Sequence, residues 1–177
     1  CSGRSSHNRP CLDYIEFVGS ELELIERFKQ VIQDYKPDII TGYFSDRFDL
    51  PYINQRAKKY RLKLDLGLDN YQIEFKAGNT NTAQITGIVH LDLFKFIRRT
   101  VGLTMNFSNY DLDSVAQELL GEKKIVIDFG EMTRIWDNNL PEIEEFCKYN
   151  LHDAELTLRL AEKLMPNLYE MVKIVGL

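Results

Sequence analysis

A helix that ends at a proline and runs directly into a buried strand most constrains the fold of this chain. Ser20 followed by Glu23 forms a capping box, and apolar residues recur behind it at helical spacing. This pattern predicts an amphipathic helix over residues 21–35, which Pro37 ends. The short, apolar, β-branched run 38–44 then predicts a buried strand.

A second helix is expected after a short polar break. Asp49 is well placed to cap it, and Pro51 lies in its first turn. Further expected elements are strands over 14–18, 72–75, 83–88 and 88–93, helices over 94–101 and 112–119, and a long last helix with Pro141 in its first turn. The strands at 72–75 and 83–88 are expected to form a β-hairpin. The alternation of strands and helices favours an α/β sheet domain.

Composition excludes several classes of protein. The chain has 177 residues, 44% hydrophobic and 28% charged, which rules out a disordered tail, a collagen-like chain and a small disulfide scaffold. No apolar run approaches the roughly 18 to 20 residues of a membrane span, and no secretory signal is evident. Three cysteines without CxxC spacing indicate a reduced, cytoplasmic protein. The net charge of −5 argues against a broad basic surface, but allows a nuclease that gathers carboxylates around metal ions.

Residues 1–13 are expected to be a flexible lead-in, and residues 14–177 to form the domain. Within that domain, Asp49 lies just past the carboxyl end of a probable parallel strand. This is the edge where α/β sheets usually place their sites. A helix N-cap explains the same residue more simply. Asp92 is a weaker candidate, for which a turn or cap role is favoured.

Tyr149 and Asp153 form the second candidate site. Their spacing puts both side chains on one face of a helix, one turn apart, where a phenol and a carboxylate can hold a water between them. A carboxylate on an otherwise apolar face is costly unless it is paired or binds a metal. A half-exposed pair on a surface helix accounts for the spacing equally well.

These motifs, taken in order, resemble the proofreading 3′–5′ exonuclease domain of family B DNA polymerases, and the archaeal pattern in particular. The family's second exonuclease motif, Y-N-x-x-x-F-D followed by x-P-Y, stands here as YFSDRFDLPY at residues 43–52. Its third motif, Y-x-x-x-D, is matched by Tyr149 and Asp153. The resemblance extends over roughly residues 14–177.

The resemblance implies an α/β, RNase H-like exonuclease fold, truncated at the N-terminus and carrying an inserted β-hairpin. It implies hydrolysis of the 3′-terminal phosphodiester with two Mg²⁺ or Mn²⁺ ions. By this resemblance Asp49 and Asp153 are metal ligands, and Tyr149 orients the attacking water. The substrate would be a single-stranded 3′ end of DNA, contacted by Phe44 and Phe48. The other expected partners are the remaining domains of a parent polymerase, and no membrane.

Two departures from the family pattern keep alternatives open. The D-x-E of the first exonuclease motif is not found, so the chain is expected to begin after it and to leave the strand at 38–44 with an open edge. Phe44 stands where the family usually has an asparagine, and it cannot supply amide hydrogen bonds. The isolated chain is therefore expected to be weakly active or inactive. The alternatives are a non-catalytic exonuclease-like module that binds DNA or braces a polymerase and, less favoured, a stand-alone RNase H-like nuclease.

Overall fold

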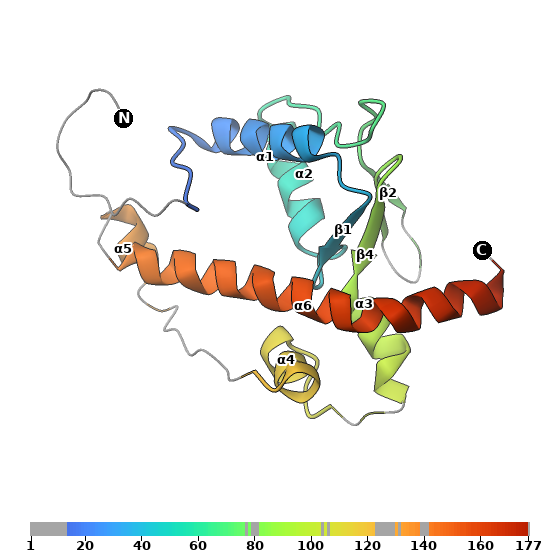
Figure 1. Cartoon of the computed structure of the whole chain (residues 1–177). Coiled ribbons are helices and arrows are strands. Elements are labelled where there is room, and N and C mark those ends of the chain that lie inside the picture. The colour runs from blue at the N-terminus through green and yellow to red at the C-terminus, as the bar shows by residue number, and fades with distance from the viewer. Residues whose placement is uncertain are drawn as a thin grey trace.

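The chain combines helices with strands, as the sequence predicts for an α/β domain (Figure 1). The computed structural model describes residues 14–76, 78, 82–103, 105, 107–122, 130, 132–138 and 142–176. The elements in chain order are α1 (Glu21–Tyr35), β1 (Ile39–Gly42), α2 (Asp49–Lys59), β2 (Glu74–Lys76), β3 (Thr82–Gln84), β4 (Val89–Asp92), α3 (Leu93–Arg99), the 3₁₀ turn η1 (Val101–Leu103), α4 (Leu112–Leu120), α5 (Met132–Asp137) and α6 (Ile143–Val175). The expected lead-in at 1–13 and Pro141 lie outside the described residues.

The strands β1 and β4 form a parallel pair at the centre of the molecule (Figure 1). Ile39 lies opposite Val89, and Gly42 lies opposite Asp92. Parallel strands need a long crossover, which α2 and the β2–β3 segment provide here. Both strands therefore end at the same edge of the sheet, and the loops that follow them are neighbours. Within the described part of the chain, β1 pairs with no strand other than β4, and its residues are half-buried.

An antiparallel pair, β2 with β3, occupies the predicted hairpin. The second hairpin strand is shorter than the expected span 83–88. Ile85 pairs back with Ile88 across a tight turn in which Gly87 has a φ of +79°, so the chain reverses before entering β4. A further expected strand, over 14–18, is wrong. Those residues form no strand, because none of the described strands lies beside them to complete a ladder.

Local capping signals fix α1 at its predicted bounds. The Ser20 hydroxyl accepts a hydrogen bond from the Glu23 backbone N–H at 3.2 Å, and the Glu23 carboxylate accepts one from the Gly19 N–H at 2.6 Å. Tyr35 is the last residue of the helix. Lys36, in the left-handed conformation, caps it immediately before Pro37. The same logic holds for α4, where Asp111 is the N-cap and Gly121 the left-handed stop.

Two buried apolar clusters hold the elements together. The first lies between α1, α2 and the chain that leads through β3 to β4, and includes Ile25, Ile32, Leu50, Ala57, Leu64, Leu66, Ile73, Ala83, Ile85 and Ile88. The second joins α3 and α4 to α6, and consists of Leu93, Ile97, Val115, Ala116, Leu156, Leu160, Ala161 and Leu164. In Figure 1, α6 runs along the whole width of the molecule below the sheet. This 33-residue helix contains Pro166. No helix among the described residues is both long and apolar enough to cross a membrane.

An ion pair between the first two helices gives a pH-dependent prediction. The Arg56 guanidinium and the Tyr60 hydroxyl bind the Glu21 carboxylate and lower its pKa to about 2. A lowered pKa in the folded state stabilises the fold above the ordinary carboxyl pKa of about 4.5, and this contribution disappears as the pH falls through about 2. We expect Glu21→Gln to lower the unfolding temperature at pH 7 and to have no effect below pH 2. Thermal unfolding of both proteins from pH 7 to below pH 2 measures the difference, and a penalty that persists well below pH 2 would assign the loss to packing instead.

Candidate functional site

The loop between β1 and α2 carries the first candidate carboxylate. The helix-cap interpretation of Asp49 is wrong, because Phe48 occupies the cap position of α2 and no side chain caps it. Asp49 is instead the first residue of the helix. Partial desolvation and, to a lesser extent, the nearby Asp92 carboxylate raise the pKa of Asp49 above its ordinary value. The structure thus places Asp49 near a second acid, Asp92.

Asp92 is the buried acid at the end of β4. Its Oδ1 accepts hydrogen bonds from the backbone N–H of Phe44 at 3.0 Å and of Phe94 at 3.1 Å. Its Oδ2 accepts one from the Asp46 N–H at 3.1 Å. The favoured cap role is confirmed, since the Phe94 bond caps α3. Asp92 also holds the β1–α2 loop in place. Sequence reasoning did not anticipate this role.

The second candidate pair lies on α6, where the expected spacing brings the two side chains together. The Tyr149 hydroxyl is hydrogen-bonded to the Asp153 carboxylate. Burial, followed by the neighbouring Asp113 carboxylate, raises the pKa of Asp153. Burial and the carboxylates of Asp153 and Asp113 likewise raise the pKa of Tyr149. Both residues are half-buried, which fits a half-exposed pair on a surface helix, and a further acid, Asp113, lies near Asp153.

The two oxygens of the Asp153 carboxylate differ in their surroundings. Asp153 Oδ1 is buried and has no hydrogen-bond partner among the described residues. A buried, unpaired carboxylate oxygen beside another acid is costly, and a bound cation would relieve that cost. Within the described residues, however, no group of three or more His, Cys, Asp or Glu side chains is arranged to hold a metal ion. The described residues thus fit part of a cation site.

Tyr43 is half-buried near two further acids, Asp111 and Asp92. Its hydroxyl donates a hydrogen bond to the Tyr110 carbonyl at 2.6 Å. Burial, then the carboxylates of Asp111 and Asp92, raises the pKa of Tyr43. Asp49 thus has Asp92 as an acidic neighbour, and Asp153 has Asp113.

Aromatic side chains surround the loop that carries Asp49. Phe48 is 62% exposed and its ring stacks on Tyr52, with centroids 6.0 Å apart and planes at 9°. Phe44 is partly exposed and meets Phe94 edge-on, with centroids 5.0 Å apart. The Arg98 guanidinium lies 5.9 Å from the centre of the Phe94 ring. Exposed, pre-ordered rings of this kind can stack on unpaired bases.

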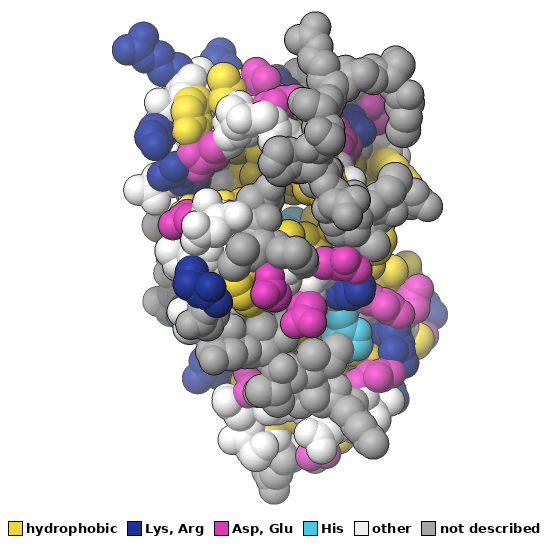
Figure 2. All heavy atoms as spheres, turned by 90° about the vertical axis from the view of Figure 1, so that its left-hand side faces the viewer, with side chains coloured by type: hydrophobic (Ala, Val, Ile, Leu, Met, Phe, Trp, Pro, Cys, Tyr) yellow, Lys and Arg dark blue, Asp and Glu magenta, His cyan; other side chains and the backbone are white. Residues whose placement is uncertain are grey.

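Charge on the face seen in Figure 2 is mixed. Acidic side chains gather across the middle of that face beside a histidine, with basic side chains interspersed among them. Basic and acidic side chains are thus mixed on the described part of this face.

Sequence reasoning missed Asp113 as a neighbour of Asp153. Asp113 stands in the first turn of α4, far from α6 in sequence. The only sequence signal for Asp113 is that two acids, Asp111 and Asp113, stand close together at the start of an apolar helix. A helix cap explains this pattern as well. Only the packing of α4 against α6 brings this acid to the Tyr149–Asp153 pair.

Comparisons with known proteins agree with this geometry. Residues 3–115 match the sequence model of a family described as DNA polymerase family B, exonuclease domain. The chain is 35% identical over 166 residues to DNA polymerase 1 of Pyrococcus abyssi, covering 93% of this chain and 21% of that protein. It is 34% identical over 168 residues to a DNA polymerase of Thermococcus litoralis, covering 10% of that protein.

A solved structure of the family B DNA polymerase from the hyperthermophilic archaeon Pyrobaculum calidifontis is also similar. The TM-score is 0.70 at 26% identity, over 81% of this chain and 18% of that one. The chain thus spans about a fifth or less of the length of these relatives. Since the family match covers more than half of the sequence, the chain belongs to the exonuclease domain family of the family B DNA polymerases.

Proposed function

We propose that this chain is the 3′–5′ exonuclease domain of a family B DNA polymerase, and that it removes mispaired nucleotides from a single-stranded 3′ end. The observation that carries the proposal is the buried Oδ1 of Asp153, which accepts no hydrogen bond from the described part of the chain and lies beside Tyr149 and a further acid. In this proposal Asp49 and Asp153 hold divalent cations, Mg²⁺ or Mn²⁺, which prefer carboxylate and water ligands. Such cations, when bound, stabilise the negative charge that develops on the attacking and leaving oxygens.

The roles of the protein's own groups follow from their positions. The Tyr149 hydroxyl, hydrogen-bonded to Asp153, is suited to orient a water beside that carboxylate. The raised pKa of Tyr149 keeps its proton on the phenol at neutral pH, so it acts as a hydrogen-bond donor and not as a base. Phe44 and Phe48, beside Asp49 on the loop, would stack on the terminal bases without reading their sequence.

The architecture fits the same proposal. We assign residues 14–177 to part of an RNase H-like exonuclease domain, with β2–β3 as an inserted hairpin and with the first exonuclease motif outside this sequence. The other domains of a parent polymerase would be its partners, and the cytoplasm its location. The C-terminal end of α6 supports a protein partner, because Tyr169, Met171, Val172, Ile174 and Val175 are all exposed there.

A second function, a non-catalytic module that binds DNA or braces a polymerase, is favoured by one observation. Phe44 stands where the family usually has an asparagine side chain. The Phe44 backbone N–H already donates a hydrogen bond to Asp92. In that case Phe44 and Phe48 would still contact DNA, but the acids would hold no cation.

Titration of Mn²⁺ into the protein, followed by calorimetry, separates the two functions. We expect saturable binding that is weakened in both Asp49→Ala and Asp153→Ala, because each variant removes one oxygen ligand of a shared site. Glu170→Gln is the matched control, since it removes one negative charge from the exposed surface of α6. The longer polymerase should be titrated in parallel. Absence of binding in it would reject the nuclease and support the non-catalytic module.

A further inference from the structure

The loop of residues 43–48 holds a conformation that its own sequence does not favour. Phe44 has a φ of +64°, in the left-handed region that a bulky residue rarely adopts. A Cβ at Gly42 would collide with the Ser45 side chain, which folds back over the end of β1. Inside the loop, the Phe48 N–H bonds to the Phe44 carbonyl at 3.1 Å. A strained turn of this kind persists only where surrounding contacts over-determine it.

Asp46 supplies those contacts from the centre of the loop. The residue is only 3% exposed. Its Oδ1 accepts a hydrogen bond from the Ala83 N–H of β3 at 2.6 Å, and its Oδ2 forms an ion pair with Lys95 of α3. Its own N–H donates to Asp92 Oδ2 at 3.1 Å, at the end of β4. One side chain and its amide thus join the loop to three separate elements.

His90 completes the surroundings of Asp46. Its Nδ1 lies 3.3 Å from Asp46 Oδ1 without forming a well-directed hydrogen bond, and its Nε2 lies 2.9 Å from the Ser45 hydroxyl. The order Ser–His–Asp has the spacing of a nucleophilic triad. The His90 side chain is only 1% exposed and Ser45 is buried, so no substrate reaches them. The three side chains therefore serve packing and orientation.

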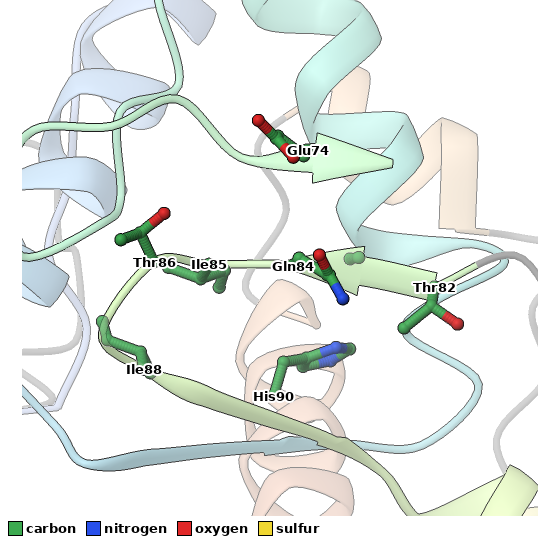
Figure 3. A pocket seen from close by; sticks show the side chains of 8 residues that line it. Glu74, Thr82, Gln84, Ile85, Thr86, Ile88 and His90 are labelled. Carbon is green, nitrogen blue, oxygen red and sulfur yellow. The ribbon is translucent and has the colours of Figure 1, made fainter. Parts of the chain in front are cut away.

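A cavity separates most of the hairpin from β4 at this point. It measures about 320 Å³ and is lined by residues of β3 and by His90, which points from β4 toward the hairpin (Figure 3). Packing within the first buried cluster, which includes Ala83 and Ile85, also holds β3 and the turn after it. The Asp46–Ala83 hydrogen bond adds a direct polar link between the hairpin and the loop.

We propose that Asp46 is a positioning residue, which fixes the loop carrying Phe48 and Asp49 and transmits displacements of the β2–β3 hairpin to Asp49. Leu50 continues the connection, because its N–H bonds to the Ser45 carbonyl at 3.1 Å and so sets the first turn of α2. A displacement of the hairpin would thereby alter the position of the Asp49 carboxylate. The inference rests on the proposed function of Asp49, but its structural part can be tested without it.

Hydrogen–deuterium exchange in the full-length protein tests the structural part. Asp46→Asn keeps the size and one acceptor but removes the ion pair with Lys95. Ala83→Pro removes the N–H that points to Asp46 and not to β2. We expect both variants to raise the rate of amide exchange in residues 43–50 by about tenfold. This is the change expected when one charge-assisted hydrogen bond is lost. Asp65→Asn, which breaks a partly buried ion pair with Lys29 elsewhere, should leave that segment unchanged.

Exchange that rises only within the hairpin of Ala83→Pro, or that stays at wild-type levels in Asp46→Asn, would overturn the inference. In the active polymerase, the kcat for 3′-end hydrolysis should fall about tenfold in Asp46→Asn, in excess of any change in Asp65→Asn. An unchanged kcat with faster loop exchange would also reject the positioning role. If the wild-type polymerase shows no hydrolysis, the proposed function fails, and the exchange result alone still decides whether hairpin and loop are coupled.

Discussion

Asp153→Asn should make the polymerase that carries this domain lose 3′-end hydrolysis by about 100-fold or more, while making the metal-free protein more stable. The activity falls because the substitution removes a charged oxygen from the proposed cation site. The stability rises because burial and Asp113 disfavour the ionised Asp153 in the folded state. Activity on a single-stranded oligonucleotide and unfolding temperature in a chelator measure the two effects.

The sign of the stability effect follows from the raised pKa. A folded-state pKa above the ordinary value of 3.8 means that the folded protein binds the proton more tightly than the unfolded chain does. Stability therefore falls as the pH rises from about 3.8 through the folded-state value, and it stays lower at neutral pH. Asparagine removes this penalty, so we expect the unfolding temperature at pH 7 to rise by about 1–3 °C.

Added Mn²⁺ should raise the unfolding temperature of the wild type above that of Asp153→Asn. A cation that binds only the folded state stabilises the wild type, and it has less effect on Asp153→Asn. Glu170→Gln should leave both activity and the response to Mn²⁺ unchanged, since Glu170 is exposed on the same helix. A loss of stability in metal-free Asp153→Asn would contradict the view that this carboxylate is held at an energetic cost.

Leu160→Ala should lower the free energy of unfolding by about 3–4 kcal/mol, the largest stability effect that we expect. Leu160 is 0% exposed, at the centre of the cluster through which α6 packs on α3 and α4. Truncation removes buried apolar surface and leaves a cavity that the surrounding helices fill only in part. Urea unfolding, followed by helix content, gives the change directly.

Leu158→Ala is the matched control, on the same helix and with the same chemical change. Leu158 is 54% exposed, so its truncation should change the free energy of unfolding by no more than about 0.5 kcal/mol. Equal losses in the two variants would mean that α6 is not held by this cluster.

The parts of the fold that the sequence predicted are those encoded by neighbouring residues. The capping box at Ser20 and Glu23, together with Pro37, defines α1 within one segment, and its bounds are confirmed. The parallel β1–β4 pair follows from the alternation of elements. The strand expected at 14–18 failed because a strand requires a partner that the local pattern cannot supply.

In the candidate site, too, only the features encoded by neighbouring residues could be predicted. The Tyr149–Asp153 contact follows from helical spacing and is present. The surroundings of Asp46 could not be predicted, because a polar Ser-Asp-Arg break is typical of an exposed turn. Its burial depends on Lys95 and Ala83, which only the assembled fold brings close. The metal-binding roles of Asp49 and Asp153 stay predictions.

Pro166 gives α6 two segments that can bend relative to each other. Proline has no N–H to donate to the Glu162 carbonyl, so one rung of the helical hydrogen-bond ladder is absent there. The helix is roughly 50 Å long at 1.5 Å per residue, with Tyr149 and Asp153 on one side of the proline and the exposed apolar end on the other. A neighbouring domain seated on that end could therefore change its angle while the acid-bearing turns stay in place.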